Sequence, residues 1–141
     1  MSLQIRWCRP DDFECLTDFD DHFSQRRADK LRAVRYVHSF TCFVADDEGE
    51  IVGFMIMENL HDNSHYMSQI NVKKSLQRQG VGTQLVRKVF EIIGAGGHIS
   101  LCVNTDNYPA IKFYESLGFM VCGFTAGYRR GQDKLWYQID V

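Results

Sequence analysis

The sequence predicts an α/β (α+β) fold, with a mixed, mostly antiparallel central sheet of six to seven strands and about four helices covering its two faces. Three observations predict this fold. Short β-rich runs recur along the whole chain, the stretch from Val81 to Ile93 carries apolar residues at helical spacing, and a second helix begins at Pro109. A chain of 141 residues buries about two-thirds of its unfolded surface as one domain, so we expect residues 1–141 to form a single domain.

In the first half of the chain, strands outnumber helices. Pro10 separates the first strand from an acidic helical segment, and the acidic and glycine residues between Asp46 and Gly49 are typical of a hairpin turn. The expected strands are Leu3 to Arg6, Thr41 to Ala45, Glu50 to Met57 and Tyr66 to Val72, and the expected helices are about Asp11 to Phe19 and Asp29 to His38. Residues 1–3 could be an expression remnant and are assigned no role.

The second half of the chain contains the clearest helix. Its apolar face consists of Val81, Leu85, Val86, Val89, Phe90 and Ile93, and glycines end it from Gly94 onward. Ile99 to Val103 is apolar enough to be a buried central strand, and the helix from Pro109 follows it. We expect the last two strands at about Met120 to Phe124 and Leu135 to Ile139, joined by a loop from Thr125 to Asp133.

Composition excludes several classes of function. A net charge of −2 at pH 7 and a sequence pI near 6.2 argue against a nucleic-acid binder, which needs a sustained basic surface. No apolar run approaches the ~18 to 20 residues that would span a bilayer. The N-terminus also lacks the apolar stretch of a signal peptide. We therefore expect a cytoplasmic protein that binds neither nucleic acid nor a membrane.

The cysteines and histidines do not predict a metal site. The five cysteines are an odd number without a C-x-x-C pair, which favours reduced, mostly buried thiols; they are Cys8, Cys15, Cys42, Cys102 and Cys122. His61 and His65 have an H-x-x-x-H spacing, but they lie in a polar stretch that is not predicted to be helical. No third and fourth ligand is evident, so we expect no metal.

A glycine-containing run opens the amphipathic helix. It reads Gln77-Arg78-Gln79-Gly80-Val81-Gly82 and follows the predicted strand that ends at Val72. Backbone N–H groups at a helix N-terminus carry partial positive charge, and glycines let an anion approach them. The run therefore predicts a cradle for a phosphate-like group, and a plain turn before a helix is the alternative.

A second motif, N-x-x-A-x-x-F-Y-x-x-L-G-F, runs from Asn107 to Phe119. Together with the earlier Q-x-x-G-x-G, it closely resembles the GCN5-related N-acetyltransferase (GNAT) superfamily. The resemblance spans essentially the whole chain, from Ile5-Arg6 to the C-terminal strands. It implies the GNAT fold and the transfer of an acetyl group from acetyl-coenzyme A to a primary amine of a small-molecule or peptide acceptor.

The resemblance implies where acetyl-coenzyme A binds. Backbone N–H groups of the cradle would contact its pyrophosphate with charge support from Arg78, and the strand before the cradle would pair with its pantetheine arm. The expected coenzyme-binding residues are Asn71, Val72, Lys73, Gln77, Arg78, Gln79, Gly80, Val81, Gly82, Thr83, Asn107 and Tyr114. Lys74 and Arg87 could assist. For Asn107 an ordinary helix cap is the alternative, and for the lysines and Arg87 an ordinary surface charge.

The resemblance also assigns two catalytic groups. The backbone N–H of Val72 would polarise the thioester carbonyl and stabilise the oxyanion of a tetrahedral intermediate, where one donor is worth ~3 kcal/mol. Tyr114 lies where the family places a tyrosine that protonates the departing sulfur, and a phenol of pKa near ~10 is protonated at neutral pH. Simple packing is the alternative for both residues.

The base that deprotonates the acceptor amine is open. An alkylamine of pKa near ~10.4 is protonated at pH 7, so a base or proton wire is expected. Many family members have a carboxylate on the strand before the cradle, but Met67-Ser68-Gln69-Ile70 contains no acid. The remaining candidates are Glu58, His65, or a water chain through Ser68 and Tyr66.

Charge patterning leaves the acceptor open. Acidic residues crowd the first helical segment (Asp11, Asp12, Glu14, Asp18, Asp20, Asp21), and five basic residues follow (Arg26, Arg27, Lys30, Arg32, Arg35). An acidic rim there would attract a cationic amine, and a solvated helix face is the alternative. Tyr128, Arg129 and Arg130 in the loop before the last strand would equally suit an acidic acceptor.

Two alternative functions and the oligomeric state stay open. A coenzyme-A-binding regulatory or scaffold protein would keep the cradle without turnover, and the missing strand carboxylate is compatible with it. A nucleotide-binding domain of another fold has less support, because no G-K-[ST] follows and Leu85 replaces the third glycine of a dinucleotide fingerprint. By resemblance alone, a homodimer through the C-terminal strands is compatible with this chain.

Overall fold

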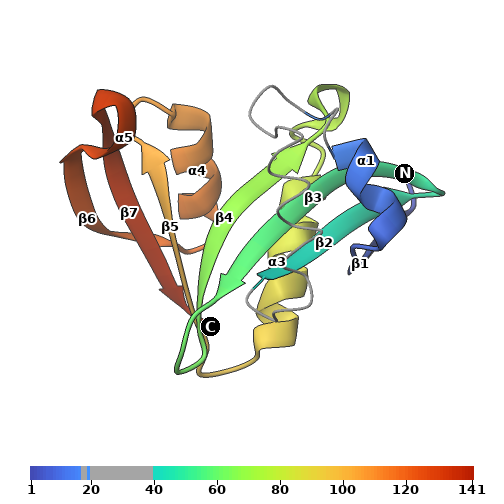
Figure 1. Ribbon diagram of the computed structural model, residues 1–141, viewed down its shortest axis with the longest axis horizontal. Coiled ribbons are helices and arrows are strands. Elements are labelled where there is room, and N and C mark those ends of the chain that lie inside the picture. The colour runs from blue at the N-terminus through green and yellow to red at the C-terminus, as the bar shows by residue number, and fades with distance from the viewer. Residues whose placement is uncertain (17–18, 20–39) are drawn as a thin grey trace.

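The structure, a computed structural model, describes residues 1–16, 19 and 40–141. Its strands form one seven-stranded sheet in the order β1-β2-β3-β4-β5-β7-β6 (Figure 1). The strands are β1 (Leu3–Trp7), β2 (Phe40–Asp47), β3 (Glu50–Asn59), β4 (Ser64–Val72), β5 (His98–Asn104), β6 (Met120–Gly127) and β7 (Gln132–Asp140). Every neighbouring pair is antiparallel except β4 and β5, which confirms the expected mixed, mostly antiparallel sheet.

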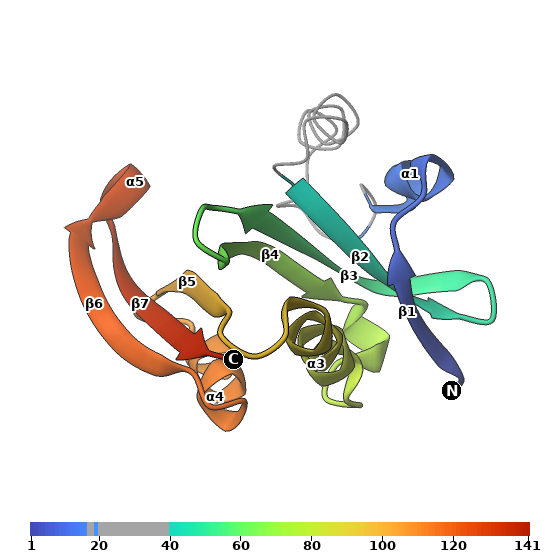
Figure 2. The ribbon, with the colours of Figure 1, turned by 90° about the horizontal axis from the view of Figure 1, so that it is seen from below.

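Helices cover both faces of the sheet (Figure 2). α3 (Val81–Ile93) and α4 (Tyr108–Ser116) lie on one face, and α1 (Phe13–Leu16) lies on the other. The fourth helix in the described part of the chain, α5 (Tyr128–Gly131), is one turn between β6 and β7. The 3-10 turns are Pro10–Asp12 and Lys74–Leu76. The helix expected from Asp29 to His38 lies outside the described residues.

The amphipathic helix is confirmed from end to end. α3 begins after Gly80 and ends at Gly94, whose N–H donates to the Phe90 carbonyl. Its buried residues are Val81, Leu85, Val86 and Val89, and they pack on the main core together with Ile99, Leu101, Tyr114 and Tyr137. A second cluster on the opposite face of the sheet contains Leu16, Val44, Ile51, Phe54 and Ile56. The sheet is thus apolar on both faces.

Three local expectations are corrected. The segment from Thr125 to Asp133 is not a loop, because β6 continues to Gly127 and β7 begins at Gln132 after the single turn of α5. The first helical segment is a 3-10 turn followed by the four residues of α1, and Phe19 lies in a bend. All five cysteines are free, but Cys15 and Cys122 are exposed and the others are half-buried, so most thiols are not buried.

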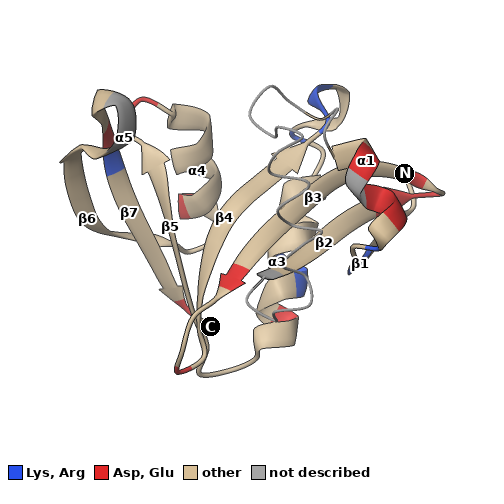
Figure 3. Ribbon diagram, viewed as in Figure 1, with Lys and Arg blue, Asp and Glu red and all other residues tan. Residues whose placement is uncertain are grey.

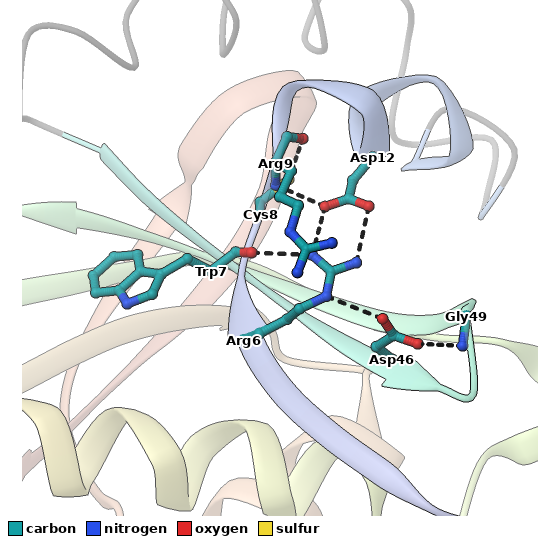
Figure 4. A network of polar contacts seen from close by, with 7 residues as sticks. All are labelled: Arg6, Trp7, Cys8, Arg9, Asp12, Asp46 and Gly49. Carbon is teal, nitrogen blue, oxygen red and sulfur yellow. Dashed lines mark hydrogen bonds and ion pairs between the residues drawn. The ribbon is translucent and has the colours of Figure 1, made fainter.

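One polar network ties the start of the chain to the sheet (Figure 4). The Arg6 guanidinium donates to Asp12 Oδ2 at 2.8 Å and Oδ1 at 3.1 Å, and its Nε donates to Asp46 Oδ2 at 3.0 Å. The N–H of Arg9 donates to Asp12 and that of Gly49 donates to Asp46. Asp12 therefore belongs to a structural ion pair and not to an open acidic rim. The described acidic residues of this segment lie at α1 and the turn before it (Figure 3). Asp18, Asp20, Asp21 and the basic run after them lie outside the described residues.

The parallel strands β4 and β5 separate after a short contact. They pair only at Ser64–His98, His65–Ile99 and Tyr66–Ser100, and then diverge into a V toward their C-terminal ends (Figure 1). From Met67 to Val72 the β5-facing side of β4 therefore has no strand partner among the described residues. Within the described part of the chain, no helix is both long and apolar enough to cross a membrane.

Candidate active site

The predicted cradle lies at the N-terminus of α3. Gly80 adopts φ 88°, which favours glycine, and a Cβ there would meet no atom within 4 Å. No side chain caps the helix, and its first turn contains no acidic residue. The first intrahelical bond runs from the Gln84 N–H to the Gly80 carbonyl, so the N–H groups before it have no helical acceptor. The cradle is thus open and electropositive, as an anion site requires.

Gly82 holds the cradle against its neighbours. A Cβ at Gly82 would lie 3.2 Å from Phe113 Cζ and 3.8 Å from Val72 Cγ2. The residue therefore brings α3 close to both α4 and the end of β4. Only glycine allows this approach without displacing the Phe113 ring.

The polar side chains around the cradle mostly hold its own backbone. Gln77 Nε2 donates to the Val72 carbonyl at 3.1 Å, and Gln79 Nε2 donates to the Ser75 carbonyl at 3.3 Å. Lys73 forms an ion pair with Glu50, so the ammonium group of Lys73 already has an acidic partner. Arg78 is exposed and has a positive φ of 65°. Lys74 and Arg87 are exposed as well. Arg78 is thus better placed than Lys73 to act as a mobile positive charge beside the cradle.

The backbone of Val72 faces the V between β4 and β5. The Lys73 N–H donates to the Val52 carbonyl on β3 at 2.9 Å, and N–H groups alternate sides along a strand. The Val72 N–H and carbonyl therefore point away from β3, and the carbonyl is the acceptor of Gln77. By the same alternation the backbone groups of Asn71 point toward β3. The backbone of Asn71 therefore cannot bind a ligand in the V, and only its side chain could do so.

Tyr114 lies on α4 in the main core. It is 7% exposed and packs against the rings of Phe113 and Phe119. Burial and the nearby Cys102 raise the pKa of Tyr114 to about 12, so the hydroxyl keeps its proton at neutral pH. The structure records no hydrogen bond from this hydroxyl to another described residue, which leaves it available as a donor. Asn107 caps the same helix, its Oδ1 accepting from the Ala110 N–H at 3.4 Å.

A polar and aromatic group lies on the face of the sheet opposite α3 and α4. The Tyr66 hydroxyl and Cys102 Sγ lie 3.2 Å apart, across the point where β4 and β5 separate. Trp136 on β7 packs near both Tyr66 and Tyr128. Glu58 pairs with Tyr66 in the β3–β4 register and acts electrostatically on its hydroxyl. Burial, Cys102 and weaker contributions from Tyr128 and Glu58 raise the pKa of Tyr66, so it stays a neutral phenol.

The structure does not bring His65 together with this group. His65 lines a pocket of about 220 Å³ with Val89, Ile92 and Ile93, at the C-terminal end of α3, whereas the cradle is at its N-terminal end. Its ring nitrogens lie 3.0 Å from the Oδ1 atoms of Asn59 and Asn63. Burial lowers the pKa of His65.

The comparisons with known proteins decide the family. A model of the acetyltransferase (GNAT) family matches residues 4–119. The chain belongs to this family. The match includes the cradle, the separating strands and α4, so the GNAT fold and the observed sheet agree.

Individual GNAT relatives are distant. N-alpha-acetyltransferase 30 of Xenopus laevis is 29% identical over 93 residues, which is 60% of this chain and 34% of that protein. The chain therefore spans about a third of the length of this relative. Among solved GNAT structures, a ribosomal-protein alanine N-acetyltransferase of Escherichia coli has a TM-score of 0.84 at 21% identity, covering 99% of this chain and 94% of its own. A spermidine N-acetyltransferase variant of Vibrio cholerae has a TM-score of 0.83 at 19% identity, covering 98% and 93%. At these identities the likeness concerns the fold.

Sequence reasoning missed part of this GNAT site. Cys102 was predicted only as a reduced thiol, and Asn104 and Trp136 were assigned no role, although all three lie on the same face of the sheet as Tyr66. Ile99, Leu101 and Val103 alternate into the core, so a period of two along β5 would have assigned Cys102 and Asn104 to the other face. Nothing local in the sequence signals that Trp136 joins them.

Proposed function

We propose that the chain is an N-acetyltransferase that moves the acetyl group of acetyl-coenzyme A to a primary amine by direct attack, through a tetrahedral intermediate. The observation that carries the proposal is one juxtaposition. The uncapped N-terminus of α3, the outward-facing Val72 N–H and the α4 helix that bears Tyr114 meet at the C-terminal end of β4, beyond the point where β4 leaves β5. Membership of the GNAT family supports the same reading.

The residues present fit acetyl-coenzyme A as co-substrate. The open space at Gly80 and the free N–H groups from Gln79 to Thr83 suit a pyrophosphate, with Arg78 as the accompanying charge. The unpaired edge of β4 suits the amide-bearing pantetheine arm, which can pair with it as a strand would. Gln77 would act indirectly, because its bond to the Val72 carbonyl fixes the turn between β4 and the cradle.

Two groups would act on the thioester. The Val72 N–H would donate to the carbonyl oxygen as negative charge develops on it, an effect worth ~3 kcal/mol for one donor. The amine nitrogen forms a bond to the carbonyl carbon, the carbon–sulfur bond breaks, and the sulfur takes a proton from the Tyr114 hydroxyl. Burial keeps that hydroxyl protonated, since it raises the pKa of Tyr114 to about 12.

Glu58 is the base that the geometry supports best. It lies beside Tyr66 on the face of the sheet where Tyr66 borders the V, whereas His65 lies in the pocket at the other end of α3. Tyr66 has a raised pKa, so it would pass a proton toward Glu58 and not hold a negative charge itself. The amine would thus lose its proton along a short chain from Tyr66 to Glu58.

The melting temperature with and without saturating acetyl-coenzyme A tests the proposal, with NAD and ATP as controls. At ~100 times Kd, binding adds ~2.7 kcal/mol, or several degrees for a chain of this size. We expect a shift with acetyl-coenzyme A alone, followed by release of free thiol when amines are added. A larger shift with NAD or ATP, or thiol release that no amine accelerates, would contradict the proposal.

A further inference from the structure

The pocket that contains His65 lies outside the proposed active site. It has a volume of about 220 Å³ and is formed by the C-terminal end of α3 together with residues of β1, β2, β3 and β4. The cradle lies at the other end of this 13-residue helix, so about 20 Å of helix separates the cradle from the pocket. No step of the proposed acetyl transfer uses the pocket, which is therefore a second candidate binding site.

Aromatic and aliphatic side chains form most of this pocket. The rings of Trp7 and Phe43 lie 4.5 Å apart between centroids, at an interplanar angle of 37°. Phe43 is buried, but Trp7 is 55% exposed and Ile92, which also lines the pocket, is 46% exposed. The pocket therefore leaves a large indole ring and an aliphatic side chain partly in water. A ligand that covers them gains hydrophobic free energy.

The polar side of the pocket is uncharged and held in place. Asn59 and His65 are cross-strand partners, and the His65 ring nitrogens lie 3.0 Å from the Oδ1 atoms of Asn59 and Asn63. Burial lowers the pKa of His65, so its ring is neutral at pH 7. No acidic residue, lysine or arginine is among the described residues that line the pocket. The pocket thus offers an ionic ligand no opposite charge.

We propose that this pocket binds a neutral aromatic compound of one or two rings. An apolar cavity of about 150 Å³ holds benzene, so about 220 Å³ leaves room for a second ring or a small substituent. An ionic group placed beside Met57, Val89 and Ile93 would lose its hydration without gaining a partner. One pocket with two exposed apolar side chains does not supply the ~800 Å² per partner that a stable protein interface buries, which favours a small molecule over a protein.

Titration calorimetry of the full chain with indole tests the proposal. Indole has two fused rings and no charge, and we expect a Kd of about 1 mM or tighter for a ligand of this size. An indole carboxylate and a quaternary ammonium derivative of indole carry opposite charges on the same ring system. Each should bind at least roughly tenfold more weakly than indole. The quaternary derivative has no amine to acetylate, so it cannot act as an acceptor.

A matched pair of variants locates the bound indole. Trp7→Ala removes the exposed ring that lines the pocket and should weaken indole binding by roughly tenfold. Phe124→Ala removes a ring that is 59% exposed on β6, the other edge strand of the sheet, and should bind indole as the wild type does. Ile92→Asn replaces apolar surface at the pocket with an amide and should weaken binding severalfold. Because Ile92 is exposed, its melting temperature without ligand should stay within about 2 °C of wild type.

Three results would overturn the proposal. They are no heat of binding at several times the expected Kd, equal affinity for indole and its charged analogues, and unchanged affinity in both Trp7→Ala and Ile92→Asn. Loss of indole binding on saturation with acetyl-coenzyme A would place the indole in the active site and also contradict the second site. Because calorimetry requires no turnover, the result does not depend on whether the proposed acetyltransferase function holds.

Discussion

At the scale of single residues, Tyr114 combines deep burial with a hydroxyl that finds no hydrogen-bond partner among the described residues. A second buried tyrosine, Tyr137, uses its hydroxyl to donate to Glu115 Oε1 at 3.0 Å. The two buried phenols therefore differ: Tyr137 is hydrogen-bonded to a neighbouring carboxylate, and Tyr114 keeps a hydroxyl that suits the proposed role of proton donor.

Tyr114→Phe should lower kcat by roughly 10²-fold, because the departing sulfur loses its proton donor. The affinity for acetyl-coenzyme A, measured by calorimetry, should not change, since the ring remains in place. Tyr137→Phe is the matched control: it should lower the free energy of unfolding by about 1 kcal/mol and leave kcat near the wild-type value. Unchanged turnover in Tyr114→Phe would contradict the proposed role, and a protein that only binds coenzyme A has no turnover to lose.

Arg6 is the residue on which the N-terminal network depends. Its side chain is 12% exposed and bonds to both Asp12 and Asp46. Burial opposes ionisation of Asp12, but the hydrogen bonds from Arg6 and the Arg9 N–H outweigh it and hold the pKa of Asp12 below its usual value. The hydrogen bond from Arg6 likewise lowers the pKa of Asp46. Both carboxylates thus stabilise the fold when ionised.

Arg6→Met should lower the free energy of unfolding by about 3 kcal/mol at pH 7, because it leaves two carboxylates without their cation. Since both folded-state pKa values are lowered, this stabilisation is fully present above about pH 4 and is lost as the pH falls further. Urea unfolding at pH 7 and pH 3 should therefore show a smaller difference from wild type at the lower pH. Lys88→Met removes an exposed ion pair with Glu91 and should cost under about 0.5 kcal/mol. A pH-independent effect of Arg6→Met would rule out this account.

At the scale of elements, α3 has glycines with positive φ at both ends. Gly80 has φ 88° and Gly94 has φ 75°, and a Cβ at either would meet no atom within 4 Å. The two positions therefore share their backbone requirement and their open surroundings. They differ in that only Gly80 belongs to the cradle.

Gly80→Ala and Gly94→Ala should each lower the free energy of unfolding by about 1 to 2 kcal/mol, because alanine is strained at positive φ. Only Gly80→Ala should also weaken acetyl-coenzyme A binding, by roughly tenfold, since its Cβ would occupy the space next to the cradle N–H groups. Titration calorimetry at a temperature where both variants are folded measures the difference. Equal affinities in the two variants would show that the N-terminus of α3 does not hold the coenzyme.

At the scale of the whole molecule, β6 is an edge strand with exposed apolar side chains. It pairs with β7 on one side only within the described part of the chain, and Met120, Val121 and Phe124 are 72%, 57% and 59% exposed. A long apolar edge strand is a template for pairing with another strand. A second copy of β6 is a self-complementary partner, which supports the proposed homodimer.

Light scattering after size exclusion should therefore report a dimer at tens of micromolar, and Phe124→Lys should shift it to the monomer. Both forms should keep the melting-temperature shift with acetyl-coenzyme A, because β6 is remote from the cradle in the sheet order. Ile92→Lys, which places the same charge at an exposed apolar residue of α3, should remain dimeric. A wild-type monomer at these concentrations would contradict the dimer.

The sequence by itself determined the elements whose physics is local. The helical period and flanking glycines of Val81–Ile93 predicted α3 to the residue, and the alternation and turn signals located each strand to within a few residues. The two motifs also identified the GNAT family, because the cradle and the Asn107–Phe119 helix are continuous in sequence. Local reasoning was wrong between Thr125 and Asp133, where pairing of β6 with β7 extends both strands beyond their apolar runs.

Only the tertiary structure decided which residues meet in the site. Strand register determines where β4 diverges from β5 and that the Val72 N–H points away from β3. The side chain of His65 lies in a pocket at the C-terminal end of α3, away from the Tyr66 hydroxyl, although the two residues are adjacent in the sequence. Asn71 and Asn104 are ordinary polar residues in the sequence. In the folded chain, Asn71 Nδ2 and Asn104 Oδ1 are buried without a hydrogen-bond partner among the described residues, because burial and hydrogen bonding are properties of the packed molecule and not of the sequence.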